Sequence, residues 1–190
     1  MLVGIDEVGR GSMAGPLVVG VVSMSSTKLP LKDSKQLSLK QREVLNKKIY
    51  RYAKYAALGW AWPHEIDKFG LTYCTRIAIL RAVDPTDDRF SDILIDGSVN
   101  FIKDYPKSRT LIKADASIPS VSAASIIAKV ARDNYMRYMA GFLPEYGFAS
   151  HVGYCTPEHL MAVKKIGPSC LHRLSYRPLS NFDLVQEKLF

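Results

Sequence analysis

Acidic residues stand at three places where the sequence predicts that a buried strand ends. Asp6 and Glu7 lie in the apolar segment of residues 2–8, just before two closely spaced glycines. Asp96 ends the segment Asp-Ile-Leu-Ile-Asp, and Asp115 comes just after the segment Arg-Thr-Leu-Ile-Lys. Carboxylates are seldom buried unless they are paired or bind a metal ion. If these strands are neighbours, about 5 Å apart in one sheet, the four carboxylates converge on one patch.

Such a patch repels itself, and divalent cations relieve the repulsion. Ligand sets made of oxygen alone favour Mg²⁺ or Mn²⁺. A pair of such ions about 3.5–4 Å apart promotes phosphodiester displacement, because one ion activates the attacking water while the other stabilises the leaving oxygen. Taken singly, each acid is more simply interpreted as a residue that ends a strand or forms a turn. The grouping of all four predicts a metal site.

Asp6 and Glu7 are adjacent, and adjacent residues of a strand face opposite sides of a sheet. They can share one metal site only if the strand ends or bends at this point. Gly9 and Gly11 follow closely, and glycine allows the backbone to turn sharply. We therefore expect a bend at the two acids.

The composition indicates one domain that binds a polyanion. The 190 residues carry 26 Lys and Arg against 18 Asp and Glu, a net charge of +8, which suits nucleic acid or an anionic membrane. No apolar stretch approaches the ~20 residues that span a bilayer, and the N-terminus lacks the basic region of a signal peptide. The cysteines, Cys74, Cys155 and Cys170, match neither a disulfide framework nor a zinc site. We expect a cytoplasmic protein that binds phosphates through its basic surface and does not enter a membrane.

Hydrophobic patterns place the acids in one mixed sheet flanked by helices. Helices are expected after Ser38, which forms a capping-box pattern with Gln41, over residues 71–83 and 119–138, and from Thr156 onward. Small residues at the start of the third helix would let it pack closely on the sheet. We expect five strands, the first two forming a hairpin, at residues 2–8, 17–23, 56–62, 92–96 and 109–113.

Five motifs occur in order along nearly the whole chain. They are Asp6-Glu7-Val8-Gly9-Arg10-Gly11-Ser12-Met13-Ala14-Gly15-Pro16; Asp33-Ser34-Lys35-Gln36-Leu37-Ser38; Leu94-Ile95-Asp96-Gly97; Lys113-Ala114-Asp115-Ala116 with residues 123–130 and Arg132-Asp133; and His151-Val152-Gly153-Tyr154-Cys155-Thr156 with His159, Gly167-Pro168 and His172-Arg173-Leu174-Ser175-Tyr176. Together they resemble the motifs of bacterial ribonuclease HII, the type-two ribonuclease H.

The resemblance implies an α/β fold and an activity. Residues 1–145 would form a ribonuclease H-like catalytic domain, a mixed five-stranded sheet flanked by helices, and residues 146–190 a small helical C-terminal extension packed on it. The implied enzyme is an endoribonuclease that hydrolyses the RNA strand of RNA–DNA hybrids. It also cuts 5′ to ribonucleotides embedded in duplex DNA and leaves 3′-hydroxyl and 5′-phosphate ends. It would act as a monomer, with Mg²⁺ or Mn²⁺ as its cofactor.

The resemblance also assigns roles to single residues. Asp6, Glu7, Asp96 and Asp115 would be the catalytic metal ligands. A glycine-rich loop would present its backbone where RNA passes into DNA, an aromatic ring would stack beside that junction, and a lysine would contact phosphate. The 2′-hydroxyl distinguishes RNA from DNA, so some group must recognise it. The residues that bind nucleic acid would be Gly9, Arg10 and Gly11 in the loop, the ring of Tyr154, and Lys35.

The chain departs from the family pattern at several positions. Ala114 stands where the family usually has Gly, and Ser117 where Lys is frequent. Val152 and Cys155 replace a usual Lys and a usual Gly, and Ser12-Met13 replaces a common Pro-Leu. Two of these changes remove a cationic side chain near the expected substrate, and none removes a candidate metal ligand.

Two other functions are compatible with the residues. A ribonuclease H-like DNA nuclease, such as a junction resolvase, would share the fold, but the adjacent acids and the glycine-rich loop favour the ribonuclease. A non-catalytic module for hybrid duplexes would gain nothing from an acidic patch. The histidines His151, His159 and His172 lack the spacing of a zinc site, so we expect them to be structural or to face phosphate.

Overall fold

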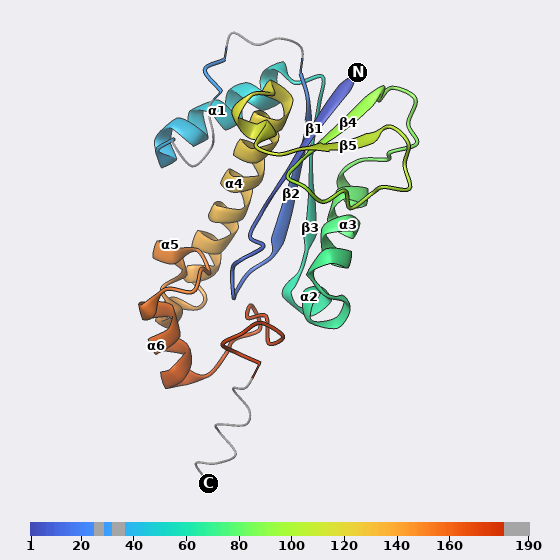
Figure 1. Cartoon of the computed structure of the whole chain (residues 1–190). Coiled ribbons are helices and arrows are strands. Elements are labelled where there is room, and N and C mark those ends of the chain that lie inside the picture. The colour runs from blue at the N-terminus through green and yellow to red at the C-terminus, as the bar shows by residue number, and fades with distance from the viewer. Residues whose placement is uncertain (25–28, 32–36, 181–190) are drawn as a thin grey trace.

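A five-stranded mixed sheet forms the centre of the computed structural model, which describes residues 1–24, 29–31 and 37–180. Strands β1 (Leu2–Val8) and β2 (Leu17–Ser23) pair antiparallel, as do β2 and β3 (Tyr55–Ala61). The pairs of β1 with β4 (Asp92–Asp96) and of β4 with β5 (Ser108–Leu111) are parallel. The predicted hairpin and the predicted mixed sheet are therefore confirmed (Figure 1). In spatial order the strands are β3, β2, β1, β4 and β5.

Helices cover both faces of this sheet. Helix α4 (Pro119–Ala140) packs on β1 and β2, with α1 (Leu39–Tyr52) against it, while α3 (Leu71–Ala82) packs on β2 and β3. Figure 1 shows α1 and α4 on one side of the strands and α3 on the other. The shorter helical elements are α2 (Pro63–Phe69), η2 (Ala114–Ala116), η3 (Pro144–Tyr146), α5 (Phe148–His151) and α6 (Pro157–Ile166). Within the described ranges, no helix combines the length and the apolar character needed to cross a membrane.

Glycines in β1 and β2 allow α4 to lie very close to the sheet. A β-carbon on Gly4 would collide with the backbone of Ser120 and Val121, and one on Gly20 would collide with the Ala124 carbonyl. The first turns of α4 consist of small buried residues, as the sequence predicted. The opposite face of β1 contributes its side chains to the larger core, which also contains α3. The central strands are therefore covered on both sides.

The structure corrects the expected elements at two places. The fifth strand ends at Leu111 rather than residue 113, because Lys113 has a left-handed backbone (φ 58°) and the chain turns into η2. The third strand ends at Ala61, because Trp62 is the N-cap of α2, a helix that the hydrophobic pattern did not predict. The capping box of Ser38 is confirmed, with both of its hydrogen bonds present.

Residues 146–180 pack on the loop that follows β1. They form one buried cluster together with that loop and the end of α4. A bridge between Ala14 and His172 joins the two segments directly. The division at residues 145 and 146 stays a prediction, but the C-terminal segment clearly supports the first loop. The cluster contains Met13, Ala14, Met136, Tyr146, Phe148, Val152, Val163, Leu171 and Leu179.

Replacing Gly20 with alanine should destabilise the protein, because the new methyl group would occupy the space of the Ala124 carbonyl oxygen. We expect the free energy of unfolding, measured with urea, to fall by more than about 2 kcal/mol. Gly141→Ala is the matched control, since Gly141 has a helical backbone (φ −69°) and its added β-carbon would lie 3.3 Å from the nearest atom. Equal effects of the two substitutions would contradict the close approach of α4.

Candidate metal and nucleic-acid site

Three carboxylates meet at the carboxyl ends of two neighbouring parallel strands. Asp6 of β1 and Asp96 of β4 lie side by side, because the residues that precede them are paired in the sheet. An oxygen of Asp96 accepts a hydrogen bond from the backbone N–H of Ala114 at 2.7 Å, which fixes η2 beside the strand end. Asp115, the next residue of η2, is buried. One oxygen from each acid lies within 4.8 Å of the others.

The surroundings of these acids disfavour a concentration of negative charge. The pKa of Asp6 is raised to about 7, mainly by burial, with a hydrogen bond from Ser125 opposing the rise and the charges of Glu7 and Asp96 adding to it. A divalent cation would relieve this repulsion. A donor set of carboxylate oxygens is the chemistry that Mg²⁺ and Mn²⁺ prefer. The three acids therefore fit a hard divalent ion.

Glu7 lies beside this cluster rather than within it. Strand β1 continues through both acids to Val8 without the expected bend, and the chain turns only at Gly9 (φ 93°). Strand alternation therefore directs Glu7 to the face opposite Asp6. Its carboxylate lies 3.7 Å from Nε of Arg10. Of the four predicted ligands, three come together, and the charge of the fourth acts on Asp6.

The glycine-rich loop presents its backbone, because the arginine side chain is held against the protein. Nη1 of Arg10 donates to Oγ1 of Thr75 at 3.0 Å, and its guanidinium lies 5.1 Å from the ring centroid of Phe101. Gly11 is exposed, and a β-carbon there would meet no atom within 4 Å. A ligand can therefore approach the backbone at Gly11 closely.

Arg132 of α4 connects this loop with Tyr154. Its guanidinium is fully buried and donates to three backbone carbonyls at 2.9–3.1 Å. It lies 5.4 Å from the ring centroid of Tyr154, and Nζ of Lys129 lies 5.5 Å from the same centroid. Arg132 belongs to the fourth sequence motif, but its charged neighbours Lys129 and Asp133 gave no sign that its side chain is buried. The three carbonyls are those of Ala14, Pro16 and Val152.

The histidines form a buried hydrogen-bonded chain that ends on Tyr154. The N–H of Ser169 donates to Nδ1 of His172, so Nε2–H of His172 donates to Nε2 of His159 at 3.0 Å. Nδ1–H of His159 then donates to the carbonyl of Tyr154 at 2.9 Å. Burial lowers the pKa of both His159 and His172 to about 4, and both are neutral at pH 7. The ring of His151 stacks on His159, so the three histidines have a structural role.

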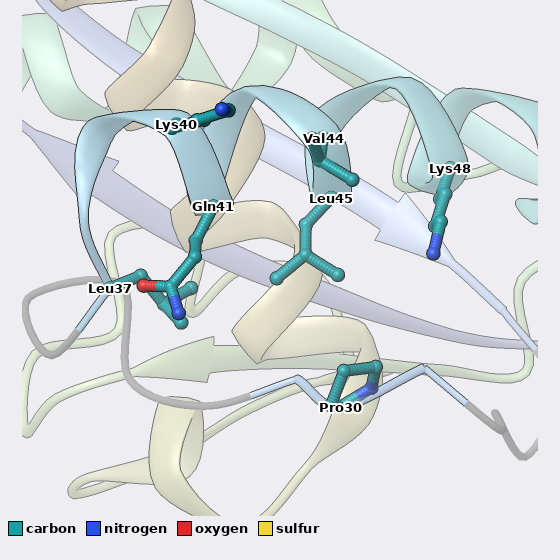
Figure 2. Close-up of a pocket in the computed structure, with 7 residues that line it drawn as sticks. All are labelled: Pro30, Leu37, Lys40, Gln41, Val44, Leu45 and Lys48. Carbon is teal, nitrogen blue, oxygen red and sulfur yellow. The ribbon is translucent and has the colours of Figure 1, made fainter.

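Lys35 lies outside the described residues, as does most of its motif. The end of that motif lines an open groove of about 500 Å³ along α1. Figure 2 shows two lysines, Lys40 and Lys48, on the helix that borders this groove. The groove is lined mainly by apolar residues and has no carboxylate among them, so it does not suit a metal ion. It is lined by Pro30, Leu37, Lys40, Gln41, Val44, Leu45 and Lys48.

The residues that depart from the family pattern lie outside the acid cluster, and Ser117 is next to it. Ser117 lines a cavity of about 130 Å³ next to Asp115. Val152 has a left-handed backbone (φ 43°) and a buried side chain, and its carbonyl accepts a hydrogen bond from Arg132. Cys155 is exposed.

Known proteins resemble this chain over nearly its whole length. A family model described as Ribonuclease HII matches residues 3–178. The chain is 42% identical to Ribonuclease HII of Dichelobacter nodosus, covering 95% of this chain and 96% of that protein, and 37% identical to Ribonuclease HII of Coxiella burnetii, covering 97% and 92%. It is similar to the structure of ribonuclease H2 from Pyrococcus horikoshii OT3, with a TM-score of 0.83, 26% identity and coverage of 98% and 99%. It is also similar to RNase HII of Archaeoglobus fulgidus in complex with PCNA, with a TM-score of 0.77, 27% identity and coverage of 93% and 95%.

The neutral histidine chain predicts that stability falls in mild acid. His159 and His172 have a pKa near 4 when folded, whereas an unfolded histidine has a pKa of about 6.5. The unfolded state therefore binds more protons between these values, and stability decreases as the pH falls from about 6.5 toward 4. We expect His172→Gln to reduce this dependence of the free energy of unfolding on pH. His64→Gln, which changes an exposed histidine, should leave it unaltered, and a similar effect of both would contradict the prediction.

Removing one charge from the acid cluster should affect stability differently with and without metal. In EDTA we expect Asp6→Asn to unfold at the same or a higher temperature than the unchanged protein, because burial disfavours the charge of Asp6. With Mg²⁺ or Mn²⁺ present, the unchanged protein should gain thermal stability and Asp6→Asn should gain much less. Asp88→Asn, at a fully exposed position, is the control. A large loss of stability of Asp6→Asn in EDTA would argue against charge repulsion in the cluster.

Proposed function

Because the chain belongs to the ribonuclease HII family and is therefore a metal-dependent endoribonuclease that acts on RNA–DNA hybrids, we propose that it also cuts duplex DNA 5′ to an embedded ribonucleotide. The cut would leave 3′-hydroxyl and 5′-phosphate ends. The observation that carries this proposal is the meeting of three buried or half-buried carboxylates at one end of the sheet, where the glycine-rich loop follows β1. A net charge of +8 provides the attraction for a nucleic acid.

The active site that we propose consists of Asp6, Asp96 and Asp115, with Glu7 at its edge, and it would hold Mg²⁺ or Mn²⁺. A pair of such ions supplies an activated water for attack and stabilisation of the leaving oxygen. The chain prepares the site by fixing its carboxylates. Asp96 accepts the Ala114 N–H, and Asp6 accepts both the Glu7 N–H at 2.8 Å and a hydrogen bond from Ser125. The ligand oxygens are therefore held in place without the substrate.

We assign recognition of the ribonucleotide to the loop of Gly9, Arg10 and Gly11 together with Tyr154. The exposed backbone at Gly11 offers space for a sugar, and an N–H group there can bind a 2′-hydroxyl. The ring of Tyr154 suits stacking beside the same sugar or its base. Arg132 binds the Ala14 and Pro16 carbonyls, which follow this loop, and lies against the Tyr154 ring. It would therefore keep a fixed spacing between the two parts of the recognition site.

Further parts of the proposal follow from the family resemblance. Lys35 would contact a phosphate of the substrate, and the lysines of the α1 groove would extend that contact along the backbone. The protein would act as a monomer made of a catalytic domain, residues 1–145, and a C-terminal extension, residues 146–190.

The direct test is a cleavage assay on three duplexes of one sequence. We expect cutting of a long RNA–DNA hybrid and of a DNA duplex with one ribonucleotide, on the 5′ side of that ribonucleotide, only when Mg²⁺ or Mn²⁺ is present. An all-DNA branched duplex should stay intact. Cutting of the branched DNA would instead identify a DNA nuclease, and binding without any turnover would identify a non-catalytic module.

The site assignment is tested by Asp96→Asn, which keeps the shape of the side chain and an oxygen for the Ala114 N–H. We expect kcat to fall by more than about a hundredfold, since even residues behind metal ligands change activity about 10–100-fold. Asp104→Asn is the control, because Asp104 is an exposed acid paired with Arg76 on the surface. Circular dichroism should show that both variants stay folded, and an active Asp96→Asn enzyme would refute the assignment.

A further inference from the structure

The peptide between Arg10 and Gly11 is held by two side chains from the far end of the chain. The hydroxyl of Tyr176 donates to the Arg10 carbonyl at 2.7 Å, and Nη1 of Arg173 donates to the same oxygen at 3.2 Å. The same nitrogen of Arg173 also donates to the Tyr176 hydroxyl at 3.0 Å. Both side chains therefore donate a hydrogen bond to the Arg10 carbonyl, and a third hydrogen bond joins them to each other. These bonds fix the plane of the peptide.

Arg173 is itself fixed by the loop that it supports. Its side chain is fully buried, and its Nε and Nη2 donate to the Gly15 carbonyl at 3.0 and 2.8 Å. Its backbone N–H donates to the Met13 carbonyl at 2.9 Å. The guanidinium fork thus spans the loop from Arg10 to Gly15, where a lysine could offer only one nitrogen.

A further set of contacts anchors the segment that carries these two residues. Asp67 of α2 accepts hydrogen bonds from the backbone N–H groups of Leu174 and Ser175, at 2.9 and 3.0 Å, and from the Ser175 hydroxyl at 2.6 Å. The segment of Arg173 and Tyr176 is therefore tied to the body of the protein at a point away from the acids.

The orientation of this peptide decides where the Gly11 N–H points. In a trans peptide the carbonyl and the following N–H point in opposite directions. With the Arg10 carbonyl directed inward at Arg173 and Tyr176, the Gly11 N–H is directed away from them. Gly11 is exposed and has open space around its α-carbon. The N–H is thus offered to a ligand on the open side.

We propose that Arg173 and Tyr176 are positioning residues for ribonucleotide selection, which hold the Arg10 carbonyl so that the Gly11 N–H meets the ribose 2′-hydroxyl. This inference rests on the proposed function, in which the loop recognises that sugar. Neither residue touches the substrate. Their contribution is to keep a flexible, glycine-flanked peptide in the single orientation that recognises RNA.

The test removes one hydroxyl, through Tyr176→Phe, and compares two substrates. We expect kcat/KM on a duplex with one ribonucleotide to fall about tenfold, as the loss of one well-placed hydrogen bond implies. The inhibition constant of an all-DNA duplex of the same sequence should change less than twofold. Arg173→Lys should lower kcat/KM on the ribonucleotide duplex more strongly than Tyr176→Phe does, again with less than a twofold change in the inhibition constant of the all-DNA duplex.

Tyr55→Phe is the matched control, because the Tyr55 hydroxyl donates to the Ala82 carbonyl in the interior, far along the chain from the loop. It should leave both values unaltered. An unchanged kcat/KM in Tyr176→Phe, or an equal loss of affinity for both duplexes, would overturn the inference, since a merely structural role affects both alike. If the unchanged enzyme did not cut the ribonucleotide duplex at all, this result would refute the proposed function itself, and the inference that rests on it would be refuted too.

Discussion

The carboxylates of Asp6, Asp96 and Asp115 repel one another, and much of the surrounding structure offsets this repulsion. Carboxylates this close, two of them on paired strands, are unfavourable unless a cation joins them. Local hydrogen bonds compensate in part. The Glu7 N–H in β1 and Ser125 in α4 bind Asp6, and the Ala114 N–H in η2 binds Asp96. The close carboxylates thus lower the stability of the metal-free protein, although a metal site requires their charge.

The two faces of the sheet have different roles: one packs on α4 beside Asp6, and the other packs on α3 and holds Arg10. On the α4 side, glycines in β1 and β2 let the helix backbone lie directly on the strands, and Ser125 of α4 forms a hydrogen bond with Asp6. On the α3 side, Arg10 is bound by Thr75 and faces the larger core. Glu7 lies on this second side, so the acid pair connects the carboxylate cluster with the glycine-rich loop.

The sequence predicts the local parts of this arrangement well. The apolar and β-branched segments at residues 2–8 and 17–23 became β1 and β2 with unchanged bounds, and Ser38 caps its helix as expected. Helix α2 escaped prediction because Trp62 extends an apolar strand pattern. The contacts of Arg132 and Arg173 with residues 10–16 could not be predicted from spacing, because they join residues 116 to 163 positions apart in the chain. Which carbonyl a buried arginine binds depends on tertiary packing.

The buried histidines have a consequence for which metals the protein can retain. Imidazole nitrogens attract zinc, nickel and copper more strongly than they attract magnesium. Here both nitrogens of His151, His159 and His172 already take part in hydrogen bonds. A late transition metal would have to break these bonds to bind, so the histidine-rich C-terminal segment does not act as a trap for it. The hydrogen bonds thus leave the carboxylates of the acid cluster, rather than these imidazoles, as the groups for which divalent ions compete.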